Sequence, residues 1–145
     1  MTLSRFLGLI LLASISFTSY ADNTAEFGDY IVNYNALPTD ALLPEVARAY
    51  KIKRSNNRGM LNIVIQRKTS NGAKGVKAKV TGTGSNLNGQ LKHLVFREIG
   101  EEGVTYYISE FRVTNKEMIA FKINVQPEGS STSHIVEFKK EFYTD

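Results

Sequence analysis

Apolar and polar side chains alternate in short segments along most of the chain, and this two-residue period constrains the fold more than any other feature. Successive side chains of a β-strand point to opposite faces of the sheet, so a strand with one buried face shows this alternation. The pattern is clearest at residues 61–65, 76–80 and 119–125. Weaker or shorter segments of the same kind lie at residues 30–34, 89–99, 104–111 and 136–142. We therefore expect the domain to consist almost entirely of β-structure.

Short segments that contain glycine or asparagine separate the strand-like segments. They lie at residues 71–72, 88–89, 100–103 and 128–131. These residue types tolerate the positive φ angles of hairpin turns, and turns spaced by about 10–15 residues are typical of sandwiches and barrels. We predict one all-β domain, an antiparallel immunoglobulin-like β-sandwich of seven or eight strands, with a small closed β-barrel as the alternative. The cysteines and tryptophan that mark true immunoglobulin domains are absent from the chain.

Residues 44–50 depart from the strand pattern and predict one short helix. Pro44 suits the first helical position, where a missing N–H costs no helical hydrogen bond. Glu45 lies near the positive end of the helix dipole, and lysines follow the last turn. Leu43 has no side-chain oxygen to cap the helix, so Asp40 is the alternative start.

Residues 1–21 have the parts of a cleavable secretory signal peptide. Arg5 is the only charged residue among them, and a mostly apolar run follows at residues 6–17. That run is shorter than the roughly 20 residues of a membrane-spanning helix. Ser19 and Ala21 place small side chains where a signal peptidase requires them, so we predict cleavage after Ala21. The expected mature protein is an exported single domain without a membrane span.

The absence of cysteine excludes disulfides, thiol catalysis, iron–sulfur clusters and thiolate metal sites. Without Arg5, the 18 basic residues of the chain become 17 against 14 acidic residues, a net charge of +3. Such a small charge favours solubility and does not indicate a nucleic-acid partner. The glycines at residues 82–89 precede no predicted helix, so they indicate no phosphate-binding loop, and we expect no cofactor.

His93 and His134 are the obvious candidates for metal binding or hydrolysis, and both lie in predicted strands. A metal site would need them close in space together with a carboxylate such as Glu98 or Glu137. Serines at residues 130–133 precede His134, but no nucleophile-elbow pattern surrounds them, so we interpret them as a turn. We therefore predict no catalytic and no metal-ligating residue.

The most unusual local feature is the basic segment, residues 51–59, in which four basic residues fall within eight positions. Arg54 and Arg58 have forked donors that bind a carboxylate or phosphate in bidentate fashion, and Asn57 lies between them. If the segment binds a ligand, these three residues are the ones that we predict to contact its anionic group. The favoured interpretation of the segment is an internal scaffold in which a carboxylate of the chain pairs with an arginine. The carboxylates considered for this role are Asp29, Asp40 and Glu45.

Residues 27–36 and 44–50, followed by Ile52, Arg54-Ser55 and the run from Asn57 to Gly59, resemble the DUF4426 family of small exported Gram-negative proteins. The resemblance covers nearly all of the mature chain, and its N-terminal third is the specific part. Leu43 departs from it, because a hydroxyl residue is expected there to cap the helix. The resemblance implies export to the periplasm and a β-sandwich-like domain. It implies no activity and transfers no catalytic residue.

The leading hypothesis is a non-catalytic periplasmic binding or accessory module that contacts an unknown protein or a small anionic ligand through the basic segment. A second hypothesis is a metal-dependent or hydrolytic enzyme that uses His93 or His134. A third is a structural or chaperone-like module that acts through an exposed sheet edge.

Overall fold

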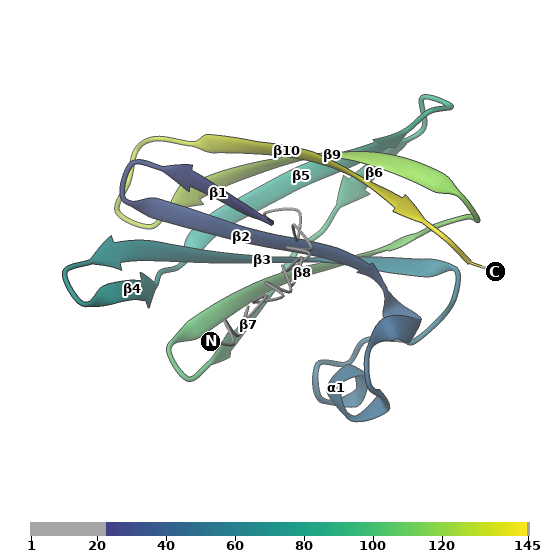
Figure 1. The fold of residues 1–145 in the computed structure, drawn as a ribbon, viewed down its shortest axis with the longest axis horizontal. Coiled ribbons are helices and arrows are strands. Elements are labelled where there is room, and N and C mark those ends of the chain that lie inside the picture. The colour runs from purple at the N-terminus through teal and green to yellow at the C-terminus, as the bar shows by residue number, and fades with distance from the viewer. Residues whose placement is uncertain (1–22, 145) are drawn as a thin grey trace, which may run out of the picture.

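The structure is a computed structural model that describes residues 23–144, which form two antiparallel β-sheets packed face to face (Figure 1). The first sheet has six strands in the order β1-β2-β3-β8-β7, with β4 paired to the far end of β3. The second has four strands in the order β10-β9-β5-β6. The predicted signal peptide, residues 1–21, lies outside the described residues.

Each sheet is built from strands that come from two separate stretches of the chain. The strands of the six-stranded sheet are β1 (Thr24–Phe27), β2 (Tyr30–Pro38), β3 (Arg58–Thr69), β4 (Gly72–Gly75), β7 (Arg97–Glu101) and β8 (Val104–Arg112). Those of the four-stranded sheet are β5 (Ala78–Asn86), β6 (Leu91–Leu94), β9 (Glu117–Pro127) and β10 (His134–Phe142). A 3-10 turn, η1 (Thr39–Ala41), and one helix, α1 (Pro44–Ala49), connect β2 to β3. None of the described helices is long and apolar enough to cross a bilayer.

The predicted β-sandwich is confirmed, and the alternative of a closed barrel is wrong for residues 23–144, whose strands form two separate sheets. The strand number of seven or eight is too low, because residues 23–144 form ten strands. Residues 89–99 form two strands rather than one, since the chain passes there from β6 in one sheet to β7 in the other. The short strands β1 and β4 were also missed. They lack strong apolar alternation and lie at the margin of the larger sheet.

The core lies between the two sheets and comes mainly from the alternating segments. Leu61, Ile63 and Ile65 of β3 are fully buried opposite the inner face of β9, where Ile119 and Phe121 are buried. Phe121 is surrounded by rings from both sheets. Its neighbours are Phe138 at 4.9 Å, Phe111 at 5.5 Å and Phe142 at 6.5 Å between ring centroids. Because aromatic pairs add stabilisation beyond the area they bury, this cluster is the centre of the contact between the sheets.

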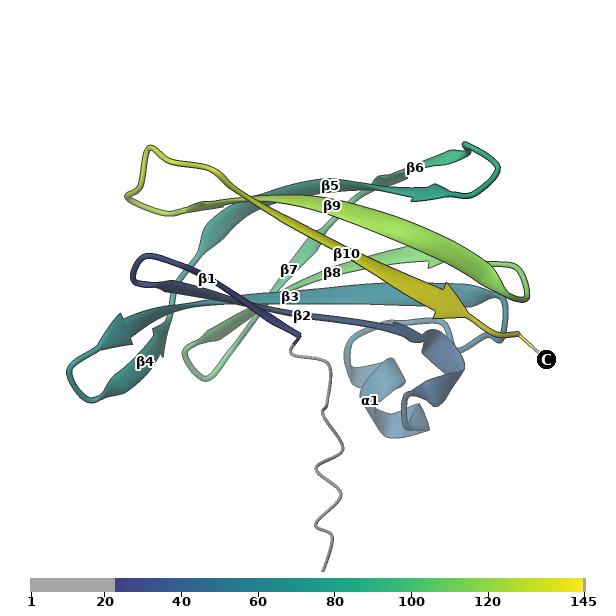
Figure 2. The same ribbon diagram turned by 45° about the horizontal axis from the view of Figure 1, so that its top comes forward.

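A second, smaller core lies on the opposite face of the six-stranded sheet, where α1 covers the ends of β2 and β3 (Figure 2). Ala47 of α1 and Ile52 are buried there against Met60 of β3 and Ile108 of β8. A helix of six residues is marginal by itself, so this packing holds it in place.

The predicted helix is confirmed, although it ends at Ala49, one residue earlier than expected. Its N-cap is Leu43, whose side chain makes no capping hydrogen bond. The alternative start at Asp40 is wrong, because Asp40 belongs to the preceding turn η1. The four predicted turns all coincide with connections between successive antiparallel strands, although Gly72, Gly100 and Glu101 belong to the adjoining strands.

The aromatic cluster predicts that Phe121→Ala lowers the free energy of unfolding by about 3–5 kcal/mol, because it removes a buried ring and leaves a cavity. Urea denaturation checks this value. The matched control is Tyr143→Ala, since Tyr143 is 58% exposed and should change the free energy by less than about 0.5 kcal/mol. Equal losses in the two variants would contradict the account of the core.

Candidate functional site

The basic segment connects α1 to β3, and its Arg54 is bonded to the chain itself. Nε of Arg54 donates to the carbonyl oxygen of Leu42 at 2.8 Å, and an Nη nitrogen donates to that of Asp40 at 3.0 Å. The guanidinium thereby joins the segment to the turn that precedes α1. Arg54 has an internal role, as the scaffold interpretation proposed, but its acceptors are backbone carbonyls rather than a carboxylate.

Asn57 is also held by the chain. Its Oδ1 accepts a hydrogen bond from Ser55 Oγ at 2.5 Å, and its carbonyl oxygen accepts one from the N–H of Val113 at 2.9 Å. The second bond joins the segment to the chain that leaves β8. Arg54 and Asn57 therefore fix the path of the segment, and the third predicted residue, Arg58, is the first residue of β3.

Arg58 lies in a cluster of charged side chains on the outer face of the six-stranded sheet. We define the arginine cluster as Arg58, Arg97 and Arg112 around Glu110. An Nη nitrogen of Arg58 lies 3.6 Å from Oε1 of Glu110, and one of Arg97 lies 3.5 Å from Oε2. Arg112 is the direct cross-strand neighbour of Arg58. Three strands, β3, β7 and β8, thus bring together arginines that are far apart in the sequence.

The cluster has more positive charge than its carboxylate balances. The two contacts with Glu110 are at or beyond the limit of a good hydrogen bond. Nε of Arg58 is buried and has no hydrogen-bond partner. The exposed Arg112 side chain makes no hydrogen bond or ion pair within the described part of the chain. Like charges directly opposite each other on neighbouring strands destabilise a sheet, so the pairing of Arg58 with Arg112 carries a cost that a bound anion would remove.

Tyr50 and Arg97 join α1 to β7 beside the cluster. An Nη nitrogen of Arg97 donates to the carbonyl oxygen of Tyr50 at 3.0 Å. The Tyr50 hydroxyl donates a short hydrogen bond to the carboxylate of Glu101, and this bond raises the pKa of Tyr50. Arg97 is therefore positioned by the helix end, whereas Arg112 is not.

The two histidines lie on opposite edges of the four-stranded sheet. His93 is exposed on β6 opposite Thr83, and His134 is half-buried at the start of β10. Three strand spacings separate β6 from β10, which amounts to about 14 Å. Metal–nitrogen bonds are near 2 Å, so a single ion cannot bind both imidazoles. Residues 23–144 contain no group of three histidine or carboxylate residues that could hold a metal ion.

His134 lines an open cavity of about 430 Å³ between the β1–β2 turn and the β9–β10 turn, together with Asp29 and Ser130. Its ring stacks on Phe27 with a centroid distance of 4.6 Å. A hydrolytic triad needs the imidazole hydrogen-bonded to the nucleophile and to an orienting group. Among the described residues, no hydrogen bond joins His134 to Ser130 or Asp29. The geometry is that of an aromatic packing contact.

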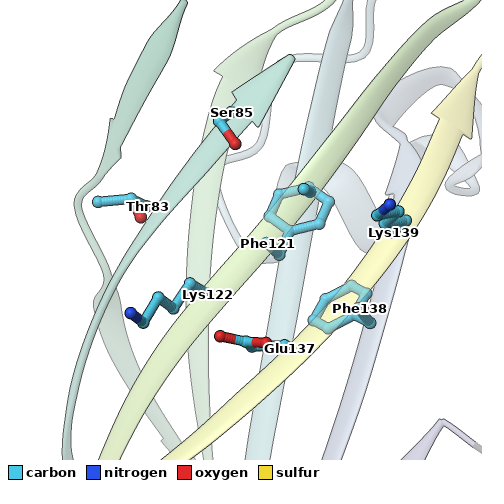
Figure 3. Close-up of a pocket in the computed structure, with 8 residues that line it drawn as sticks. Thr83, Ser85, Phe121, Lys122, Glu137, Phe138 and Lys139 are labelled. Carbon is cyan, nitrogen blue, oxygen red and sulfur yellow. The ribbon is translucent and has the colours of Figure 1, made fainter. Parts of the chain in front are cut away.

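A shallow cavity of about 380 Å³ lies on the outer face of the four-stranded sheet (Figure 3). Thr83 on β5 lies on one side of β9, and Glu137 and Lys139 on β10 lie on the other, with Lys122 on β9 itself (Figure 3). The two lysines and the glutamate carry opposite charges. The cavity therefore lacks the uniformly positive electrostatic potential that would attract an anion.

The edge strand β10 bears on the hypothesis of a sheet-edge module. It is nine residues long and forms one edge of the four-stranded sheet. Four of its residues are charged: Glu137, Lys139, Lys140 and Glu141. Charged side chains on an edge oppose the addition of a further strand. The edge is therefore a poor docking site for an extended chain.

Glu117, which the sequence did not single out, is a buried carboxylate with 8% exposure. It accepts hydrogen bonds from Asn86 Nδ2 at 2.8 Å and the N–H of Thr114 at 2.9 Å, and Nζ of Lys92 lies 3.3 Å away. Burial, the largest influence, raises the pKa of Glu117, but these hydrogen bonds and the charge of Lys92 together outweigh it and lower the pKa. The lowered pKa argues against a general acid, which needs a raised pKa, and the contacts of Glu117 join the start of β9 to β5 and β6.

Comparisons with known proteins agree with the fold. The profile of the DUF4426 family, a domain of unknown function, matches residues 24–145. The crystal structure of a DUF4426 family protein, PA0388 from Pseudomonas aeruginosa PAO1, is similar with a TM-score of 0.72 and 34% sequence identity. The similarity covers 84% of this chain and 94% of that chain. No curated protein matches the chain. The comparisons confirm the resemblance seen in the sequence and add no site residue.

The bonds of Arg54 predict that Arg54→Ala lowers the free energy of unfolding by about 1–2 kcal/mol, because two hydrogen bonds to backbone carbonyls are lost. Thermal and urea denaturation measure the change. Lys53→Ala is the matched control, since Lys53 is an exposed basic neighbour, and it should be nearly neutral. If Arg54→Ala is as stable as the control, the internal role of Arg54 is wrong.

The lowered pKa of Glu117 predicts a pH-dependent contribution to stability. A carboxyl whose folded pKa is depressed stabilises the protein above its unfolded pKa, about 4.3, and that stabilisation disappears as the pH falls through the folded pKa. Glu117→Gln should lower the free energy of unfolding by about 1–3 kcal/mol at neutral pH, and the difference should shrink in acid. Urea denaturation of both proteins over a pH series tests this, and a difference independent of pH would contradict it.

Proposed function

The chain belongs to the DUF4426 family, whose domain has no established function, and from its geometry we propose that it is a non-catalytic binding module for an anionic group. The arginine cluster is the observation that carries this proposal. Arg58 and Arg97 share one carboxylate, that of Glu110. Arg112, opposite Arg58 on the next strand, has no side-chain partner among the described residues.

The chemistry of the cluster favours a carboxylate or a phosphate as the bound group. Guanidinium groups present planar pairs of N–H donors that match the oxygens of both. Arg58 and Arg112 lie opposite each other on adjacent strands, where cross-strand Cβ atoms are about 5 Å apart. An anion between them would accept hydrogen bonds from two strands and relieve their repulsion. Glu110 and the end of α1 hold Arg58 and Arg97 in place for this contact.

The predicted residues Arg54, Asn57 and Arg58 take different parts in this proposal. Arg54 and Asn57 are positioning residues, because their side chains are bonded within the chain. Arg58 belongs to the anion site. Arg97 and Arg112, which the sequence did not single out, complete it. The proposed ligand is a small anion or the anionic group of a partner protein in the periplasm. The export signal predicted at residues 1–21 would bring the domain to that compartment.

The proposal predicts that Arg112→Gln weakens the binding of inorganic phosphate by about tenfold or more, because a charge-assisted hydrogen bond is lost. Isothermal titration calorimetry of the wild type and the variant measures this. Its melting temperature should not fall, since Arg112 has no partner in the described chain. Lys122→Gln removes one exposed charge from the other sheet and should leave binding unchanged.

Two results would contradict the proposal. One is a wild type that does not bind phosphate or a dicarboxylate such as succinate at low ionic strength. The other is an equal loss of binding in Arg112→Gln and Lys122→Gln, which would indicate attraction to net charge rather than to the cluster.

A further inference from the structure

An uncharged groove lies on the outer face of the six-stranded sheet, away from the arginine cluster and beyond the part of the face that α1 covers. It has a volume of about 330 Å³ and crosses β1, β2 and β3. We define the asparagine groove by the outward-facing residues that line it, Thr24, Asn33, Asn35, Asn62 and Val64; Asn23 and Tyr34 complete its lining. Its volume lies at the lower end of the range for small-molecule sites, about 300–1,000 Å³.

The strand register brings the carboxamides together. Asn35 on β2 is directly opposite Asn62 on β3, and Asn33 is directly opposite Val64. Thr24 on β1 is opposite Asn33 on its other side. The side chains of these residues point away from the core, because Leu61 and Ile63 occupy the inward positions of β3. The pairing of β1, β2 and β3 thus gathers three carboxamides, one hydroxyl and the apolar side chain of Val64 on one part of the outer face.

The amides of the groove retain hydrogen-bonding capacity. Oδ1 of Asn62 is buried and has no hydrogen-bond partner. Asn35 is exposed. Asn33 donates one hydrogen bond from its Nδ2 to Oε1 of Gln66 at 3.0 Å, and its own Oδ1, unbonded within the described part of the chain, is left for a ligand. A buried polar atom without a partner destabilises the fold, and a donor from a ligand would relieve that cost. The terminal torsion of asparagine is soft, so a small rotation turns the Asn62 oxygen toward a donor in the groove.

We propose that the asparagine groove binds a neutral sugar that carries an N-acetyl group. A carboxamide can donate and accept hydrogen bonds at the same time, and the hydroxyl groups of a sugar need both kinds of partner. An acetamido group pairs with an asparagine side chain through one N–H and one carbonyl oxygen, and its methyl group packs on Val64. The absence of charge among the described lining residues selects against an ionic ligand.

Chemical-shift changes in the 15N–1H NMR spectrum test this proposal, with N-acetylglucosamine as the probe and glucose and N-acetylglycine amide as comparisons. N-acetylglucosamine should shift the side-chain amide signals of Asn33, Asn35 and Asn62. Glucose should act more weakly because it lacks the acetamido group. Asn35→Ala should weaken binding by about five- to tenfold without loss of stability, since Asn35 is exposed.

The control variant is Asn124→Ala, which removes an exposed carboxamide from the outer face of the other sheet. It should bind N-acetylglucosamine as the wild type does. The proposal is overturned if N-acetylglucosamine causes no shifts in the groove, or if glucose causes equal ones. It is also overturned if N-acetylglycine amide binds as tightly, which would indicate a site for peptide amides, or if Asn35→Ala has no effect. None of these outcomes depends on the arginine cluster.

Discussion

The contact between the inner faces of β3 and β9 is the interaction on which the rest of the structure depends. The chain has no cysteine, so no disulfide joins the sheets, and their association rests on apolar packing. Phe121 lies at the centre of this contact, with Phe111 from the six-stranded sheet on one side and Phe138 and Phe142 from its own sheet on the other. Glycine at position 59 is part of the same contact, because a Cβ there would lie 2.5 Å from the ring of Phe111.

The proposed sites follow from this packing, because it leaves one face of the larger sheet outside the core. Strand β3 directs Leu61 and Ile63 inward, and the residues between and around them, such as Arg58 and Asn62, therefore point outward. Helix α1 covers only the end of that outer face. The arginine cluster lies beside the helix, and the asparagine groove lies beyond it. The same two-residue period thus builds the core on one face and both proposed binding surfaces on the other.

The sequence was sufficient to predict the β-sandwich and the short helix, because alternation and turn residues are local signals. It did not predict the division of residues 89–99 into β6 and β7, since alternation does not show to which sheet a strand belongs. The cluster was predicted only in part. Arg58 stood out as a member of a local run of basic residues, whereas Arg97 and Arg112 join it through strand pairing, which no local pattern shows. Buried Glu117 was missed for the same reason, because its partners Asn86 and Lys92 come from other strands.

The most direct test of the anion-binding account is an NMR titration of the arginine Nε–Hε signals with inorganic phosphate at low ionic strength. The account predicts that the signals of Arg58 and Arg112 shift first and saturate together. Arg67 supplies an internal reference, because it lies at the other end of β3 over the ring of Tyr30. Shifts that are equal at Arg67 and Arg112, or a complete lack of shifts at Arg58 and Arg112, would contradict the account.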